Sequence, residues 1–278
     1  MNKATNALNI PVALTIAGSD SGGGAGIQAD LRTFAFHQVH GTSAITCVTA
    51  QNTLGVNRVD SLPPEAVVAQ ISAVVADIGV QAAKTGMLLN REIIHAVAAQ
   101  VEALDIQPLV VDPVMVSRAG VQLLDENAVA ALRERLIPKA VVVTPNRHEA
   151  QILTGVEINT LEQMQQAAQQ IYQLGARAVL VKGGGMSGTL RGVDVWFDGT
   201  QLQTLRTQTV DTPNTHGTGC TLSAAVAAQL AIGKDLFTAV KSAKHYVTQA
   251  LDHALNLGEG QGPVGHFYPL LIPRSDHL

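Results

Sequence analysis

The sequence is poor in cysteine: Cys47 and Cys220 are its two cysteines, far apart and without C-x-x-C spacing. Two isolated cysteines argue against a disulfide framework or a zinc site, and a free thiol is compatible with a reducing compartment. A basic run is also absent, and the formal net charge is −4. This balance argues against binding to nucleic acid or to a membrane surface. An anionic ligand would have to be met locally, by backbone N–H groups, a lysine or a metal ion.

Other signals are missing as well. The N-terminus lacks the charged flank and the apolar stretch of a signal peptide, and no apolar run reaches the length that spans a bilayer. We therefore expect a cytoplasmic protein. No linker, low-complexity tract or repeat interrupts the sequence, so the simplest interpretation is one domain over residues 1–278. A Walker A motif is absent, so any phosphate is bound by another architecture.

What the sequence does contain is a regular alternation of two patterns, in a chain of which 46% is apolar. Buried strands are predicted at Val12–Ala17, Thr42–Thr49, Leu109–Val114, Ala140–Thr144 and Ala178–Lys182. Helices are predicted at Gly26–His37, Pro63–Ile78, Arg91–Leu104, Asn127–Leu136, Leu161–Leu174, Gly219–Leu230 and Leu236–Leu255. Asp198-Gly199 predicts a hairpin over Asp194–Arg206. The alternation predicts an α/β fold with a mostly parallel sheet, helices on both faces, and ligands at the carboxyl ends of the strands.

A glycine-rich segment at residues 17–26, Ala-Gly-Ser-Asp-Ser-Gly-Gly-Gly-Ala-Gly, joins the first predicted strand to the first predicted helix. Its glycines permit positive φ and a close approach of backbone to a ligand. Residues 24–29 match the dinucleotide pattern G-x-G-x-x-A. However, six residues separate the match from the end of the strand, and residues 43–51 contain no acid for a ribose. A tight turn without a ligand is an alternative interpretation.

The second informative segment, Thr-His-Gly-Thr-Gly-Cys-Thr at residues 215–221, precedes a predicted helix of small residues. Unpaired N–H groups around Gly217, Thr218 and Gly219 would form an anion hole at the positive end of the helix dipole. Such a hole stabilises a phosphoryl group in transfer. Cys220, in the first turn, is expected to have a lowered pKa and to accept a proton from an attacking hydroxyl. The alternative is a buried, inert thiol, which is our interpretation of Cys47; His216 is interpreted as capping or orienting the loop.

Six motifs resemble a known family when taken together in their order. They are residues 17–31, Ala-Gln-Asn-Thr at 50–53, Lys-Thr-Gly-Met-Leu at 84–88, Thr-Pro-Asn at 144–146, Val-Lys-Gly-Gly at 181–184 and the segment 215–221. They resemble the hydroxymethylpyrimidine/phosphomethylpyrimidine kinases of thiamine biosynthesis, members of the ribokinase-like superfamily. The resemblance runs from about residue 11 to about residue 255. One departure is Ser21-Gly22, where the family usually has Pro-Ser or Ser-Ser.

This resemblance implies a three-layer αβα fold and a homodimer. It implies ATP and Mg²⁺ as cofactors, and phosphorylation of 4-amino-5-hydroxymethyl-2-methylpyrimidine and then of its monophosphate. The substrate glutamine of the family falls on Gln51, whose amide offers an acceptor beside a donor, as an aminopyrimidine edge requires. Other pocket positions of the family fall on Gly18, Ala25, Asp30, Met87 and Val114. Cys220 stands where most ribokinase-like sugar kinases have an aspartate base.

The superfamily motif N-x-x-E falls on Asn146 and Glu149, whose oxygens suit a hydrated magnesium ion. Asp112, at the end of a predicted strand, is a further candidate ligand. Each of these residues taken alone is more often an N-cap or a solvated acid. Lys182 is placed to reach the phosphates of ATP. The resemblance also suggests that the final helices, through Lys241 and Lys244, wall the adenine.

Alternative functions stay open at this point. A pyridoxal or pyridoxine kinase would share the fold and the chemistry and differ in the ring of its substrate. A ribokinase-like sugar kinase would be expected to carry an aspartate in place of Cys220. A non-catalytic sensor of nucleotides or pyrimidines would not need Asn146, Glu149 and Lys182 together with residues 217–220. A dinucleotide oxidoreductase would have to bind NAD tightly, which the glycine segment does not predict.

Overall fold

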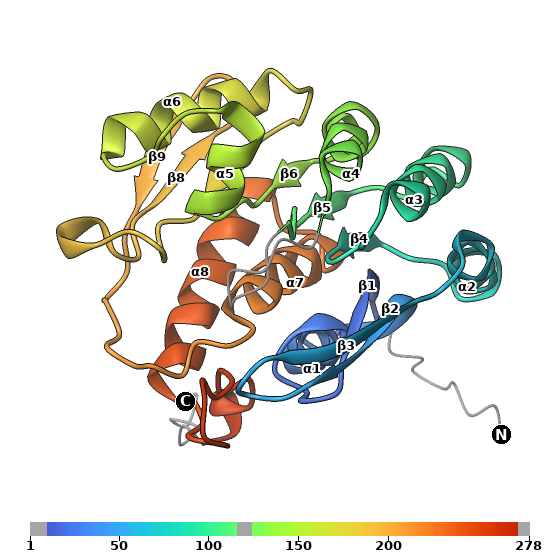
Figure 1. Ribbon diagram of the computed structural model, residues 1–278, viewed down its shortest axis with the longest axis horizontal. Coiled ribbons are helices and arrows are strands. Elements are labelled where there is room, and N and C mark those ends of the chain that lie inside the picture. Colours follow the sequence, from blue (N-terminus) through green and yellow to red (C-terminus); the bar gives the residue numbers. More distant parts are fainter. Residues whose placement is uncertain (1–9, 116–123, 272–278) are drawn as a thin grey trace, which may run out of the picture.

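The computed structural model describes residues 10–115 and 124–271. In this part of the chain one nine-stranded sheet has the order β3-β2-β1-β4-β5-β6-β7-β8-β9 (Figure 1). The strands are β1 Val12–Asp20, β2 His40–Gln51, β3 Val56–Ser61, β4 Ala82–Thr85, β5 Leu109–Val111, β6 Val142–Val143, β7 Val179–Val181, β8 Asp194–Phe197 and β9 Leu202–Leu205. The neighbours from β2 to β7 pair in parallel, whereas β3, β8 and β9 are added by antiparallel pairing.

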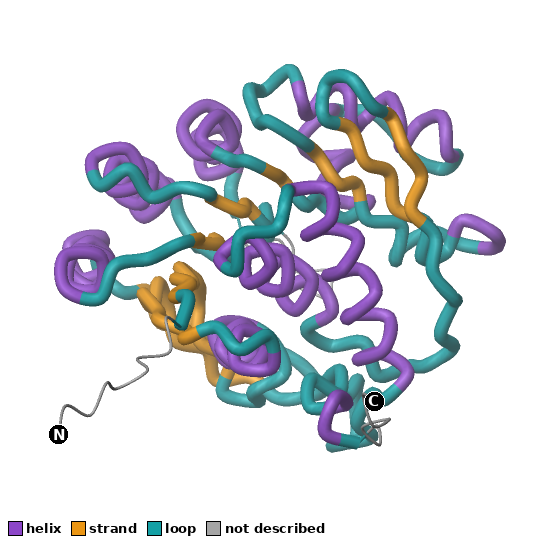
Figure 2. The backbone as a smooth tube through the Cα atoms, turned by 180° about the vertical axis from the view of Figure 1, so that it is seen from behind, coloured by secondary structure: helices purple, strands orange, loops and turns teal. Residues whose placement is uncertain are grey.

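Helices cover both faces of this sheet. They are α1 Gly26–Phe36, α2 Pro64–Asp77, α3 Arg91–Ala103, α4 Glu126–Ala131, α5 Arg147–Thr154, α6 Leu161–Tyr172, α7 Thr218–Ala231 and α8 Leu236–Asp252. Figure 1 shows α2 to α6 along one face and α1, α7 and α8 along the other. The view from behind shows α7 and α8 packed side by side across the second face (Figure 2). The α/β fold with a mostly parallel sheet is therefore confirmed.

Each face has its own apolar core. The core under α2 to α6 is built on Leu14 and Ile16 of β1 and on buried residues such as Ile93 and Leu153. On the other face, Ala13 of β1 and Phe34 of α1 pack with the small residues of α7. Neighbouring residues of β1 thus alternate between the two cores, as the period of two of a strand requires. The alanines of α7 let this helix approach the sheet closely, which brings its first turn to the ends of the central strands.

The predicted elements are present, with shifted ends and three omissions. β1 continues past Ala17 to Asp20, through a register shift against β2, and β6 is two residues long. The predicted helix Asn127–Leu136 is α4 followed by a π-helical turn at Leu132–Leu136. The strands β3 and β4 and the helix α5 were not predicted. Within the described ranges no helix combines the length and the apolar character that crossing a bilayer requires.

Candidate active site

A cavity of about 830 Å³ opens at the carboxyl ends of the parallel strands. Its wall comes from the glycine segment after β1, the β2–β3 turn, the loops after β4 to β7, the start of α7 and residues 260–261. The predicted residues in its lining are Gly18, Ala25, Gln51, Met87, Asp112, Val114, Asn146, Glu149, Lys182, Gly217, Thr218, Gly219 and Cys220. A second cleft of about 560 Å³ lies near the opposite ends of β5, β6 and β7 and contains none of them. Residues from both halves of the chain therefore meet in one cavity.

The start of α7 has the geometry of an anion site. Gly217 is the N-cap residue, with φ 80°, and no side chain caps the helix. The amide of Thr221 donates to the carbonyl of Gly217. Because the amides of Gly219 and Cys220 precede that first helical bond, they have no acceptor within the helix. A Cβ at Gly217 would lie 1.8 Å from the carbonyl oxygen of Gly24, so the glycine segment rests directly on this helix start.

Cys220 lies partly buried in the first turn of α7. Burial raises the pKa of its thiol to about 11, although the positive charge of Lys84 and the N–H of Gly26 act in the opposite direction. The expectation of a lowered pKa is therefore wrong for this structure, because removal from water outweighs the helix terminus. The sulfur carries its proton at neutral pH.

Below the cavity floor lies an ion pair that the sequence did not predict. Lys84 of β4 is fully buried, and its Nζ lies 2.9 Å from Oδ2 and 3.0 Å from Oδ1 of Asp30. The Thr15 hydroxyl donates to the same carboxylate at 2.6 Å. Burial raises the pKa of Asp30 even though the charge of Lys84 opposes the change. The structure thus places Asp30 under the cavity, where its oxygens are already bonded, and not in the cavity lining.

On the wall beside the anion site, Lys182 pairs with Asp112 at 2.9 Å. Asp112 also accepts hydrogen bonds from the hydroxyls of Thr144 and Ser223, at 3.3 and 3.2 Å. Burial would raise the pKa of Asp112, but the charges of Lys182 and Lys84 outweigh it, so the pKa lies below its ordinary value. A Cβ at Gly219 would come within 3.3 Å of Lys182 Nζ, so this cation stands next to the helix start.

Asn146 and Glu149 form a capping box at the start of α5. The Asn146 side chain accepts from the amide of Glu149 at 3.0 Å, and Glu149 Oε2 accepts from the amide of Asn146 at 2.8 Å. Burial raises the pKa of Glu149 to about 7, the charge of Lys182 opposes this, and that of Asp112 adds to it. Among the described residues no three His, Cys, Asp or Glu side chains gather as a complete metal cage. Two acids on one wall match what Mg²⁺ takes from a protein when phosphate and water supply its other ligands.

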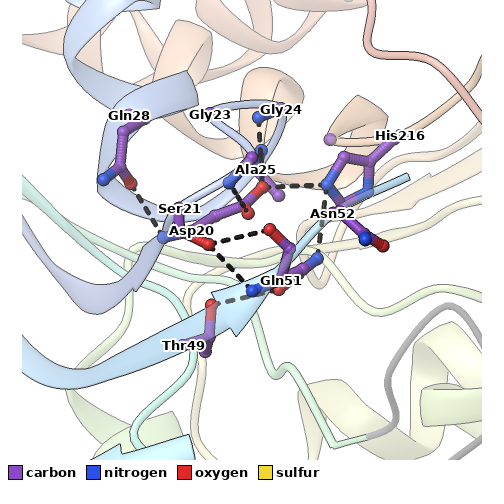
Figure 3. Close-up of polar contacts among 12 residues, drawn as sticks. Asp20, Ser21, Gly23, Gly24, Ala25, Gln28, Thr49, Gln51, Asn52 and His216 are labelled. Carbon is purple, nitrogen blue, oxygen red and sulfur yellow. Dashed lines mark hydrogen bonds and ion pairs between the residues drawn. The ribbon is translucent and has the colours of Figure 1, made fainter. Parts of the chain in front are cut away.

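Gln51 is the last residue of β2 and lines the same cavity. The Ser21 hydroxyl donates to its carbonyl and accepts from its amide, at 2.7 and 2.8 Å. Its side chain lies between Thr49 and His216 (Figure 3). The floor beside it is tight, because a Cβ at Gly18 would lie 2.7 Å from both Cys47 Sγ and Met87 Cε. Cys47 itself is fully buried, as predicted.

Two predicted nucleotide residues lie away from this lining. Lys244 is buried and pairs with Asp194 of β8 at 2.7 Å, while it also donates to the carbonyl of Gly192. Lys241 is exposed, with its Nζ 4.7 Å from the ring centroid of Phe237. Both contacts of Lys244 tie α8 to the sheet. The assignment of the two lysines to the adenine stays a prediction, because neither of them lines this cavity.

The sequence interpretation gave no role to Asp20 or to Lys84, whereas it expected His216 to cap or orient its loop. Asp20 ends β1 and accepts from the amides of Gly22, Gly24 and Ala25, so it closes the glycine segment. His216 Nε2 lies 2.9 Å from Asp20 Oδ2, which ties the segment to the helix start (Figure 3). Lys84 stood in a quoted motif without a role. A lysine inside an otherwise apolar run was the available signal, because such a residue is buried only with a partner.

Comparisons with known proteins agree with this geometry. The family model described as phosphomethylpyrimidine kinase matches residues 20–265. A hydroxymethylpyrimidine/phosphomethylpyrimidine kinase of Synechococcus elongatus is 60% identical over 94% of this chain and 99% of its own. An ADP complex of Bacillus subtilis pyridoxal kinase is 39% identical with a TM-score of 0.88, over 95% of this chain and 100% of its own. A phosphomethylpyrimidine kinase of Clostridium difficile 630 is 41% identical with a TM-score of 0.77, over 87% and 99%.

Proposed function

The chain belongs to the phosphomethylpyrimidine kinase family and is a small-molecule kinase, and from this premise we propose that it phosphorylates 4-amino-5-hydroxymethyl-2-methylpyrimidine and then the monophosphate. ATP is the donor, and the diphosphate serves thiamine biosynthesis. One observation carries the proposal: a single cavity holds Gln51, which suits an aminopyrimidine edge, together with Cys220 and the open amides of α7.

The phosphoryl group is held by the protein's own donors. The amides of Gly219 and Cys220 and the ammonium of Lys182 line the same part of the cavity. They would stabilise the negative charge that spreads over the group as it is transferred. The positive φ of Gly217 lets the chain turn into the helix here without a side chain over these amides. Both phosphorylation steps would use the same donors.

The residues of the wall fit a magnesium ion bound with ATP. Asp112 and Glu149 both line the cavity, and the raised pKa of Glu149 reflects burial close to the charge of Asp112. A divalent cation would relieve that repulsion, and when bound it would neutralise phosphate charge. In this proposal Asn146 positions Glu149 by their reciprocal capping bonds.

The two steps make different demands on Cys220. In the first, a neutral hydroxymethyl group must lose its proton, and Cys220 is the proposed acceptor. Since the pKa of the thiol is about 11 in this structure, proton uptake requires the small thiolate fraction or a further fall in pKa when the ligands are bound. In the second step the acceptor is an ionised phosphate, so no base is needed.

A phosphoryl-transfer assay with a small panel of acceptors tests the proposal. The pyrimidine alcohol, its monophosphate, pyridoxal and ribose would each be offered with ATP and Mg²⁺, and ADP formation measured. Turnover of both pyrimidines above the rate without acceptor is the expected result. No turnover of either pyrimidine would refute the proposed function. ATP consumption that depends on no acceptor would also contradict it.

Pyridoxal kinase activity is the second candidate. It is supported by the likeness to the solved Bacillus subtilis pyridoxal kinase. The same panel separates the two, since the higher kcat/KM identifies the preferred ring. A homodimer, which the family resemblance implies, and a cytoplasmic location stay predictions. Light scattering during gel filtration would test the dimer.

A further inference from the structure

Resting on the proposed function, we propose that His216 and Thr49 act as positioning residues that lock the Gln51 amide in one orientation and so make the site selective for an amino group on the ring. All three residues line the cavity, and Figure 3 shows their side chains next to one another. A terminal amide can exchange its NH₂ and its oxygen by a half-turn. The hydrogen-bonding neighbours of the amide decide which position its oxygen takes and which its NH₂ takes.

The first neighbour is a fixed donor. Asp20 Oδ1 accepts from Gly22 at 2.8 Å, and Oδ2 accepts from Gly24 at 3.0 Å and from Ala25 at 2.8 Å. Burial acts to raise the pKa of Asp20, but hydrogen bonds from His216 and Ala25 outweigh it, and the carboxyl stays ionised. An ionised carboxylate only accepts. The 2.9 Å contact from Oδ2 to His216 Nε2 therefore requires a hydrogen on that nitrogen.

The imidazole of His216 has little freedom to turn away. A Cβ at Gly24 would lie 2.3 Å from His216 Cδ2, so the ring rests on bare backbone. The main chain of His216 is held from the other side, where its amide donates to the carbonyl of Gly262 and its carbonyl accepts from Val264. The side chain of His216 is 14% exposed. Its Nε2–H is thus held toward Asp20 Oδ2, and the Gln51 amide, 3.4 Å from the same nitrogen, can only share this one hydrogen as a second acceptor.

The second neighbour is a fixed acceptor. The Thr49 hydroxyl has one hydrogen, and it donates this hydrogen to the carbonyl of Ser19 at 2.9 Å. Gln51 Oε1, at 3.3 Å, is the farther of the two acceptors within reach of this hydrogen, so with the hydrogen on Ser19 the Thr49 oxygen can only accept from Gln51. With the amide as drawn in Figure 3, its NH₂ faces a donor at 3.4 Å and its oxygen faces a hydroxyl that has no second hydrogen. The half-turned amide matches both, with its oxygen toward His216 and its NH₂ toward Thr49.

This orientation leaves one lone pair and one N–H of Gln51 for a ligand, in a set order. The remaining lone pair accepts from an exocyclic amine, and the remaining N–H donates to the adjacent ring nitrogen. A 4-oxo ring presents the reverse order, a carbonyl beside a ring N–H. The carbonyl would then oppose the Gln51 oxygen, and the ring N–H would oppose the Gln51 N–H. A free amide would turn to suit either ring. A locked amide accepts the amino ring and rejects the oxo ring.

Two measurements on the full chain test the lock. Long-range ¹H–¹⁵N spectra of labelled protein, assigned with His216→Phe, would show hydrogen on Nε2 of His216; a bare Nε2 would overturn the proposal. The second is the ratio of kcat/KM for the 4-amino alcohol to that for its 4-oxo analogue. We expect His216→Phe and Thr49→Val each to lower this ratio at least about tenfold, because the amide becomes free to turn. An unchanged ratio in both would overturn it.

Ser21→Ala is the matched control, because Ser21 holds the backbone of Gln51 without touching its amide. Ser21→Ala is expected to lower kcat/KM equally for the 4-amino and the 4-oxo substrate and so to leave their ratio unchanged. His216→Phe would give the same result if His216 only supported the structure. If His216→Phe fails to fold, Thr49→Val tests the same lock. If the wild-type protein turns over neither pyrimidine, the proposed function fails, and the lock is then decided by the nitrogen spectra alone.

Discussion

Two ion pairs of the same chemistry lie at different depths around the cavity. Lys84–Asp30 and Lys182–Asp112 each have an N···O distance of 2.9 Å. The first pair has no exposed side-chain surface, whereas the Lys182 side chain is 12% exposed and lines the cavity. A fully buried pair, which we call the sealed pair, acts on a ligand only through its electrostatic field. A lysine that reaches the cavity can also contact a phosphate directly. Access to the cavity, and not bond length, therefore separates a supporting pair from a binding pair.

The largest expected effect concerns Cys220, whose pKa both pairs influence. Cys220→Ser should slow phosphorylation of the alcohol by about 10²–10⁴-fold, the usual contribution of a general base. Phosphorylation of the monophosphate should change much less, because that acceptor is already ionised. Initial rates with the two substrates measure this, with Cys47→Ala as the control for loss of a thiol outside the cavity lining. Equal losses in both steps would show that the thiol only shapes the anion site.

The same thiol predicts a pH dependence that differs between the two steps. A thiol is neutral below its pKa, so with a pKa of about 11 the thiolate fraction rises about tenfold per pH unit between pH 7 and 9. The kcat/KM of the first step should rise with this slope, and that of the second should not. A pH profile with each acceptor checks this. A flat first-step profile would exclude Cys220 thiolate of the free enzyme as the base.

Breaking the sealed pair should give the largest loss of stability. Lys84→Met leaves the Asp30 carboxyl buried without its charge partner and should lower the free energy of unfolding by about 3–5 kcal/mol. Urea denaturation measures the change. The double variant Lys84→Met/Asp30→Leu should recover much of it, since no charge then remains. A single variant as stable as the wild type would mean that the pair contributes nothing to the fold.

Breaking the accessible pair should instead affect activity. Lys182→Met removes a cation beside the helix start and should lower kcat/KM by about 10²–10³-fold, as for other fixed donors to a developing anion. Its effect on unfolding should be smaller than that of Lys84→Met. Lys244→Met is the matched control, because it breaks a lysine–aspartate pair of 2.7 Å whose residues do not line the cavity. A loss of ATP affinity in that control would instead support the sequence-based assignment of Lys244 to the nucleotide.

The smallest expected effect is at Gln51, which lies beside the His216–Asp20 pair but, among the residues that the structure describes, next to no lysine–carboxylate pair. Gln51→Leu should leave an aminopyrimidine edge unpaired and weaken substrate binding by about 1–3 kcal/mol. Titration calorimetry with the pyrimidine alcohol measures it, with Asn52→Ala as a neighbouring control. Unchanged affinity would mean that Gln51 does not contact the ring.

The sequence was sufficient for the sheet and most helices because their apolar periods are strong. It failed at β4, where Lys84 interrupts the apolar pattern of a fully buried strand. It also failed at α5, whose eight residues are largely polar. β3 was missed because this edge strand is mostly exposed and shows no clear alternation. Short elements at edges and sites follow tertiary contacts more than local pattern.

The site residues show the same division. Glycines and Gln51 could be placed because their roles follow from backbone geometry and from hydrogen-bonding capacity. Asp30 could not, because its partner Lys84 is 54 residues away and the fold alone brings them together. The pKa shift of Cys220 was predicted in the wrong direction, because the sequence reveals the start of a helix but not the burial of the thiol. The burial of a side chain and the identity of its distant partners depend on the folded chain and cannot be read from local sequence.

The contact between Gly217 and Gly24 has a consequence for spacing across the enzyme. At this point main chain meets main chain, since even a methyl group at Gly217 would lie 1.8 Å from the Gly24 oxygen. Two segments far apart in the sequence are thereby in direct backbone contact. The reach from the ring-holding end to the helix start is then set by peptide geometry, which side-chain substitutions elsewhere cannot readily lengthen. The backbone would in this way limit the length of the acceptor that fits between Gln51 and the start of α7.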